Sequence, residues 1–311
     1  MLDAASKAFF HTLAGSRVLA RVASRYGMAG PDAFARRFVA GESVGEAIAA
    51  VRSLEAQGLQ STLDVLGESV STLAEADAAT REYLSVMDAI VAAGIGRNLS
   101  LKLTQLGLDI DRATCIDNLR RILDRAQAHA FFVRIDMESS AYTQVTLDVF
   151  ETLWSQGYRQ VGVVLQSALR RSEQDATALV AMGARIRLVK GAYNEPAGVA
   201  YQNKADVDAA YARLTRLLLS HATFPAIGTH DPAMIAVARE HAAAHAIGPE
   251  RFEFQMLYGI RRDLQAALHG EGFGMRVYIP FGTHWFPYFM RRLGERPANV
   301  GFVLRGVLHE R

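Results

Sequence analysis

The feature that most constrains the fold is an alternation of short apolar segments with longer amphipathic ones. Each apolar run has the length of a strand, and each is followed by a stretch with helical periodicity. Alternating units of this kind predict parallel strands with helices outside the sheet. The runs are Ser61–Leu66, Leu99–Leu103, Phe131–Ile135, Val161–Leu165, Ile186–Val189, Phe224–Gly228, Phe252–Leu257 and Met275–Ile279.

Eight such units favour one architecture over its competitor. The expected helices span 72–94, 111–128, 141–156, 170–183, 203–221, 232–246, 260–269 and 284–294. A (βα)8 barrel needs about 250 residues, which fits. A doubly wound sheet usually carries a Gly-rich dinucleotide loop after a strand. Here Gly94-Ile95-Gly96 precedes an apolar run and so fails that test. We therefore predict an α/β fold, a (βα)8 TIM-type barrel with N-terminal helices.

The N-terminal region is expected to be helical at 3–26, 31–40 and 43–57. We expect one domain overall, with a helical segment at 1–58 and a barrel with a C-terminal helix at 59–311. Arginines at 17, 21 and 25 form a basic stripe on the first helix. That stripe suits either a membrane-surface helix or an ordinary helix covering the fold. The narrow apolar stripe favours the second.

Composition excludes several classes of function. The chain has 34 basic and 32 acidic residues, so no nucleic-acid partner is expected. Cys115 is the single cysteine, which excludes an intrachain disulfide and a thiolate metal cluster. No apolar run approaches the roughly 20 residues that span a bilayer. We expect a cytoplasmic protein.

Polar residues stand at the predicted carboxyl ends of the strands, where barrels of this kind place their sites. Polar loops would supply some of them, but their concentration predicts a functional site. They are Asp64, Lys102, Asp136, Gln166, Lys190, Thr229, His230, Asp231, Gln255 and Tyr278.

Two segments indicate what that site binds. In Arg185–Tyr193, Arg187 and Lys190 would be costly to bury unpaired, so an anionic or electron-rich partner is expected unless they face solvent. After the eighth run, Tyr288 precedes Arg291 and Arg292 on one helix surface. Paired guanidinium groups beside an aromatic ring suit a small apolar acid.

The available chemistry is limited because no serine-nucleophile motif, phosphate loop or zinc signature is present. A Schiff base on a strand lysine or a bound organic cofactor remains. A buried pair of Lys102 and Asp136 could serve catalysis or structure alone.

Four motifs together resemble the flavin-dependent proline dehydrogenase family in its short monofunctional bacterial form. They are Arg187–Tyr193, Phe252–Gly259, Tyr278–Gly282 and Tyr288–Arg292, and the resemblance runs from about Ser61 to Arg305. It implies a distorted (βα)8 barrel with noncovalent FAD at the strand ends. It also implies that L-proline is oxidised to Δ1-pyrroline-5-carboxylate, the first step of proline catabolism to glutamate, by hydride transfer from C5 to flavin N5. Electrons would pass to a membrane quinone, with peripheral association at the inner face of the membrane and a pyrroline-5-carboxylate dehydrogenase as a further partner.

The resemblance also assigns roles to individual residues. Asp136 and Arg187 would act in catalysis. The substrate would be bound by Lys102, Tyr193, Leu257, Tyr278, Tyr288, Arg291 and Arg292. The flavin would be held by Met137, Gln166, Arg187, Val189, Lys190, Gly191, Ala192, Thr229, His230 and Gln255.

Two rival hypotheses use the same fold. One is a Schiff-base aldolase or transaldolase with Lys190 or Lys102 as nucleophile. The other is a non-catalytic barrel that serves as a partner subunit. Neither explains the arginine pair beside aromatic residues together with Arg187.

Overall fold

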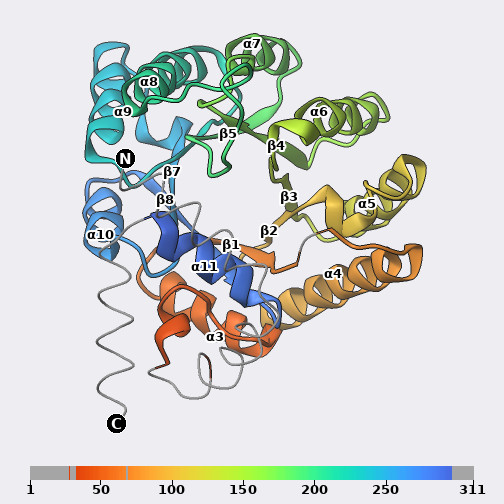
Figure 1. Cartoon of the computed structure of the whole chain (residues 1–311). Coiled ribbons are helices and arrows are strands. Elements are labelled where there is room, and N and C mark those ends of the chain that lie inside the picture. The colour runs from red at the N-terminus through yellow and green to blue at the C-terminus, as the bar shows by residue number, and fades with distance from the viewer. Residues whose placement is uncertain (1–27, 29–32, 68, 296–311) are drawn as a thin grey trace.

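The protein folds into a closed barrel of eight parallel strands with helices on its outer side (Figure 1). The computed structural model describes residues 28, 33–67 and 69–295. The strands follow one another in chain order, and β1 closes the ring by pairing with β8. Their bounds are β1 Gln60–Val65, β2 Asn98–Leu101, β3 Phe132–Ile135, β4 Val161–Gln166, β5 Arg185–Val189, β6 Ala226–Gly228, β7 Glu253–Leu257 and β8 Gly274–Phe281.

The expected TIM-type barrel is thus confirmed, with each predicted strand and its following helix in place. The helices around the barrel are α4 Leu73–Ala93, α5 Arg112–Ala128, α6 Ser140–Ser155, α7 Ser172–Ala181, α8 Lys204–His221, α9 Pro232–Ala244, α10 Arg262–Gly270 and α11 Trp285–Glu295. Short 3₁₀ helices η2 Leu103–Leu106 and η3 Pro249–Arg251 lie in the connections. β6 is shorter than predicted because Phe224 takes a positive φ of 48° and Pro225 has no N–H to donate.

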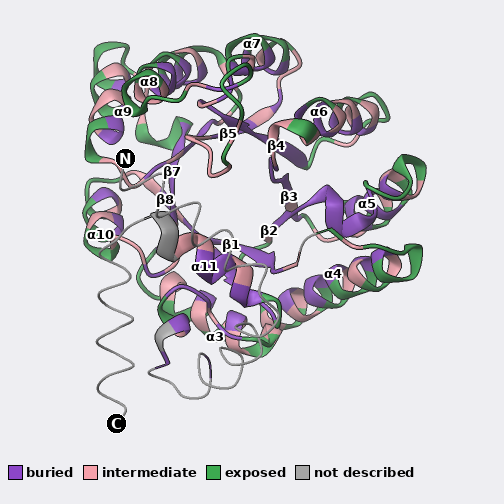
Figure 2. Ribbon diagram, in the orientation of Figure 1, coloured by how far each residue is buried: buried purple, intermediate pink, exposed green. Residues whose placement is uncertain are grey.

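Successive side chains along each strand point alternately outward, toward the helices, and inward, into the barrel. Residues such as Leu63, Leu99 and Ile186 point outward and pack beneath the helices, in one continuous apolar core. The alternate positions meet inside the barrel, where Thr62 and Ser100 lie 3.2 Å apart, hydroxyl to hydroxyl. Figure 2 shows the strands buried and the outer helix faces exposed. The inner layer is polar, an unusual filling for a barrel that normally packs branched aliphatic side chains.

Local signals fix where several helices begin. Capping boxes formed by Ser43 with Glu46 and by Thr72 with Glu75 start α3 Val44–Glu55 and α4. Asp231 caps α9 by accepting from the backbone of Ala233, with Pro232 at the first helical position. These caps satisfy backbone N–H groups that no earlier turn can reach.

The helix expected at 31–40 is not formed over that length. Its described part contains only the 3₁₀ helix η1 Phe34–Arg37. Beyond it the backbone bonds to the end of β8 instead, since Ala40 donates to the carbonyl of Pro280 and Gly41 accepts from Gly282. The expected helix at 3–26, with its basic stripe, lies outside the described residues, and the division into 1–58 and 59–311 stays a prediction.

A second apolar cluster fixes α11 beside the end of β1. The rings of Trp285 and Phe289 pack edge-on, 5.8 Å apart, and Phe289 also contacts Phe38 next to η1. Leu66, which follows β1, belongs to the same cluster. The indole N–H of Trp285 donates to Glu42 at 2.9 Å. The helix that follows β8 is therefore anchored to the segment before α3.

Candidate active site

Arg187 is the centre of a polar network inside the barrel. The residue is 5% exposed, and its guanidinium donates from three nitrogen atoms in three directions. Nη1 donates to Asp136 at 2.7 Å, Nη2 to Ser100 at 3.1 Å and Nε to Gln255 at 2.5 Å. These acceptors come from β2, the end of β3 and β7, so the tertiary fold positions the guanidinium from several sides.

Asp136 joins this network to a tyrosine and a lysine. Its second carboxylate oxygen accepts from the hydroxyl of Tyr278 at 2.7 Å. Burial, together with the nearby carboxylates of Asp136 and Asp64, raises the pKa of Tyr278 well above its usual value, so the phenol is neutral and can donate. The guanidinium of Arg187 lies 5.4 Å from the centre of the Tyr278 ring.

Lys102 lies between two carboxylates. Its ammonium is 3.4 Å from Asp64 Oδ1 and 3.9 Å from Asp136 Oδ2. The predicted pairing of Lys102 with Asp136 is therefore formed, but Asp64 is the nearer partner. Burial raises the pKa of Asp64 to about 6, and the charge of Lys102 offsets only part of that effect.

At the ends of β4 and β5, the side chain of Gln166 lies against the backbone of Gly191. Gln166 donates to the backbone carbonyl of Glu138 at 2.8 Å, which fixes its amide. Gly191 has a φ of +112°, and a Cβ there would lie 2.9 Å from Gln166 Oε1. Glycine is therefore required here, both by the positive φ and by the close packing of Gln166 against the backbone. Val189 ends β5, and Ala192 and the buried Met137 lie in the segments that follow β5 and β3.

Lys190 follows β5 and is held by two aspartates. Its ammonium contacts Asp208 on α8 and lies 2.6 Å from Asp231 at the start of α9. Lys204 also contacts Asp208, so two cations and two anions balance here. The predicted strand-end position of Lys190 is confirmed, while its contact with a flavin stays a prediction.

The end of β6 contributes His230 and Thr229. His230 Nε2 accepts from the backbone N–H of Leu257 at 2.9 Å, which requires a lone pair on that nitrogen. Thr229 is buried, and its hydroxyl accepts from the backbone of Asp231. These contacts link the end of β6 to the end of β7, where Leu257 is half-buried.

The arginine pair lies on α11 as expected. The guanidinium of Arg292 stacks 5.3 Å from the centre of the Tyr288 ring, and both Arg291 and Arg292 are half-buried. When an aromatic ring covers one face of a guanidinium, the N–H groups at the edge of that guanidinium stay directed toward another acceptor. Tyr193 is half-buried in the segment after β5.

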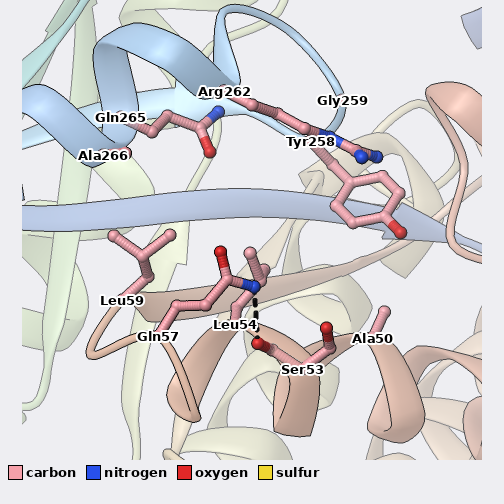
Figure 3. A pocket seen from close by; sticks show the side chains of 10 residues that line it. All are labelled: Ala50, Ser53, Leu54, Gln57, Leu59, Tyr258, Gly259, Arg262, Gln265 and Ala266. Carbon is pink, nitrogen blue, oxygen red and sulfur yellow. Dashed lines mark hydrogen bonds between the residues drawn. The ribbon is translucent and has the colours of Figure 1, made fainter.

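The described chain also contains a hollow that does not involve the network around Arg187. A hollow between α3 and α10 is lined by residues such as Leu54, Tyr258 and Arg262, and it contains none of the predicted site residues (Figure 3). In residues 28, 33–67 and 69–295, no group of three or more His, Cys, Asp or Glu side chains is arranged to hold a metal ion. Over the same ranges, no helix has the length and apolarity to cross a membrane.

Comparison of the chain with known proteins identifies its family. A family model described as proline dehydrogenase matches residues 47–305. The chain belongs to the proline dehydrogenase family. It is 44% identical to the proline dehydrogenase of Deinococcus radiodurans over 88% of this chain and 90% of that one. It is 40% identical to proline dehydrogenase 1 of Bacillus subtilis over 96% of this chain and 98% of that one.

A solved structure shows the same fold. The chain aligns with proline utilization A from Bdellovibrio bacteriovorus, inactivated by N-propargylglycine, with a TM-score of 0.78 and 28% identity. The match covers 84% of this chain and 32% of that protein, so the chain spans about a third of it. The resemblance to proline dehydrogenases inferred from four short motifs is thereby confirmed over most of the chain.

The structure brings most of the predicted site residues of this family member to one end of the barrel, and it adds some. Gln255 and Tyr278 lie within β7 and β8 rather than at their ends. Sequence reasoning placed Asp64 among the polar strand-end residues but gave it no specific role, although its isolated charge in an apolar run is the same signal that marked Lys102. It also missed Glu138, whose carboxylate accepts from the Thr104 hydroxyl at 2.6 Å, and Glu253, which accepts from Gln255.

Proposed function

We propose that this protein oxidises L-proline to Δ1-pyrroline-5-carboxylate, with noncovalent FAD as the hydride acceptor and a membrane quinone as the final oxidant. The reaction breaks the C5–H bond of proline and releases the proton of the ring nitrogen, which leaves a C=N bond. The observation that carries the proposal is the buried guanidinium of Arg187, held between Asp136, Ser100 and Gln255. A fixed cation of this kind stabilises negative charge that develops on a bound cofactor.

The residues at the strand ends fit FAD. Arg187, Gln166 and Lys190 are hydrogen-bond donors, which suit the carbonyl groups and phosphates of a dinucleotide. When bound, FAD supplies a two-electron acceptor that no side chain provides.

Substrate binding is assigned to cations and rings at the same end. Arg291 and Arg292 would bind the carboxylate of proline bidentately, with Lys102 beside them. Tyr193, Leu257, Tyr278 and Tyr288 would enclose the pyrrolidine ring. Asp136 orients Arg187 and Tyr278 through its two oxygens.

A Schiff-base mechanism has less support. Such a nucleophile must be a neutral amine. Lys190 contacts Asp208 and Asp231, and Lys102 contacts Asp64 and Asp136. Each ammonium is thus already the ion-pair partner of two carboxylates.

An absorbance spectrum of the purified protein, taken before and after L-proline is added without oxygen, tests the proposal. We expect flavin bands that bleach with L-proline and return with a soluble quinone. Flavin bands that do not bleach would reject proline as substrate. A protein that stays colourless after reconstitution with FAD would reject the cofactor. The quinone, peripheral membrane association and a pyrroline-5-carboxylate dehydrogenase partner stay predictions.

A further inference from the structure

A line of hydrogen bonds runs through the barrel interior, from Arg187 toward the amino-terminal ends of the strands. Arg187 Nε donates to Gln255 Oε1, and Gln255 Nε2 donates to Glu253 Oε1. Glu253 in turn receives Arg276 through both oxygens, at 2.9 and 3.0 Å. Glu253 and Gln255 are two residues apart on β7, so their side chains share the inner face of that strand.

The neighbours of Gln255 allow its amide only one orientation. A guanidinium can only donate, and an ionised carboxylate can only accept. The amide must therefore present its carbonyl to Arg187 and its NH₂ to Glu253. A flipped amide would place donor against donor and acceptor against acceptor, which replaces two hydrogen bonds by two repulsive contacts.

Glu253 is able to impose this orientation because it stays ionised. Its side chain is 2% exposed, and burial alone would raise its pKa. The charge and hydrogen bonds of Arg276, with the hydrogen bond from Gln255, instead lower that pKa below its usual value. Arg276 is held from the other side by the carbonyl of Ser61 and the amide of Gln60, each within 2.8 Å.

We propose that Glu253 is a positioning residue for the active site. It fixes the amide of Gln255, and through that amide it fixes the guanidinium of Arg187. The inference rests on the proposed function, because that function makes Arg187 a site residue. The competing explanation is that Glu253 and Arg276 form an ion pair that only stabilises the barrel.

The test uses E253Q, which keeps the shape of the side chain and removes its charge. Q60A is the matched control, because it removes a partner of Arg276 without touching the contact between Glu253 and Gln255. The full-length, FAD-loaded protein is assayed for kcat/KM with L-proline. The Nε–H resonance of Arg187 is recorded on arginine-labelled protein without substrate and assigned by its absence in R187K.

We expect E253Q to lower kcat/KM by about 10- to 100-fold, the cost of losing a charge-assisted hydrogen bond. We also expect it to shift the Arg187 Nε–H resonance, while Q60A changes neither. In a Q255A background, E253Q should cause no further loss, because the two residues act in series. If E253Q folds poorly, E253Q combined with R276M removes both charges of the ion pair and should give the same loss.

A kcat/KM within twofold of wild type together with an unmoved resonance would overturn the proposal. Additive effects of E253Q and Q255A would do so as well, since Glu253 would then act by another route. Failure of the proposed function looks different. Wild-type protein would not oxidise L-proline, yet the resonance of Arg187 would still report whether Glu253 orients it.

Discussion

At the scale of single residues, Asp64 has an environment that makes its protonation important. Lys102 donates to its Oδ1, while its Oδ2 is buried and has no hydrogen-bond partner among the described residues. Burial raises its pKa to about 6, against a usual value near 4. The unfolded chain therefore loses this proton at a lower pH than the folded protein does.

Because of this raised pKa, we expect the contribution of Asp64 to the free energy of unfolding to fall as pH rises from about 4 to about 6. In that window the folded protein holds a proton that the unfolded chain has released, so the free energy of unfolding drops as pH rises, by about 3 kcal/mol in total. D64N should remove this dependence. Urea unfolding of both proteins from pH 3.5 to 7.5 measures the difference.

Glu75 provides a control of opposite sign. Hydrogen bonds from Ser71 and Thr72 lower the pKa of this exposed side chain at the start of α4. The difference in the free energy of unfolding between wild type and E75Q should therefore grow as pH rises. A wild-type minus D64N difference that also grows with pH would contradict the raised pKa of Asp64.

At the scale of elements, the loop after β5 and the first turn of α6 support each other. The side chain of Ser139, at the N-cap of α6, accepts no hydrogen bond from the helix backbone. Glu195, which lies 55 residues after Ser140, provides the capping acceptor instead. Its carboxylate accepts from the backbone N–H of Ser140 at 2.7 Å and from the Ser140 hydroxyl. An acceptor with negative charge suits a helix N-terminus. The contact ties the segment of Tyr193 to the helix that follows Asp136.

Removal of this cap should affect stability and substrate binding together. E195A should lower the free energy of unfolding by about 1 kcal/mol and raise KM for L-proline roughly threefold, with little change in kcat. S43A, which removes the cap of α3, should cost a similar stability without changing KM. Steady-state kinetics and urea unfolding of both variants measure the two effects, and an unchanged KM in E195A would separate the loop from the site.

At the scale of the whole molecule, the site is assembled from every part of the barrel. Arg187 alone connects residues of β2, β5 and β7 with the residue after β3. A ligand that bonds to the ends of β4 to β7 therefore joins segments far apart in the sequence. Such a ligand binds the folded chain and not the unfolded one, so it must stabilise the fold.

Cofactor removal should accordingly lower the melting temperature. With FAD at 100 times its Kd, the folded state gains about 2.7 kcal/mol, which corresponds to a Tm increase of about 5 °C in a domain of this size. NAD, which shares the adenine dinucleotide but lacks the isoalloxazine, serves as control and should cause no shift. Equal shifts with FAD and NAD would contradict a flavin-specific site. Differential scanning fluorimetry of FAD-free protein makes the measurement.

Much of the fold was predictable because its signals are local. The short, continuous apolar run Val161–Leu165 has the length and composition of a buried strand, and Pro232 after Asp231 marks a helix start. The segment after η1 was not predictable, since Ala40 and Gly41 bond to the distant end of β8.

The sequence by itself determined the order of strands and helices, the end of the barrel at which charged residues gather, and the family. The first two follow from periodicity and from residue types at strand ends, and the family follows from the resemblance of four short motifs. All of these signals depend only on near neighbours along the chain. Only the tertiary structure decided which charges meet: Lys102 with Asp64, Lys190 with two aspartates, and Arg187 with Gln255 and Glu253 behind it. Those pairings depend on the stagger between strands of a closed barrel, a quantity that no single segment encodes.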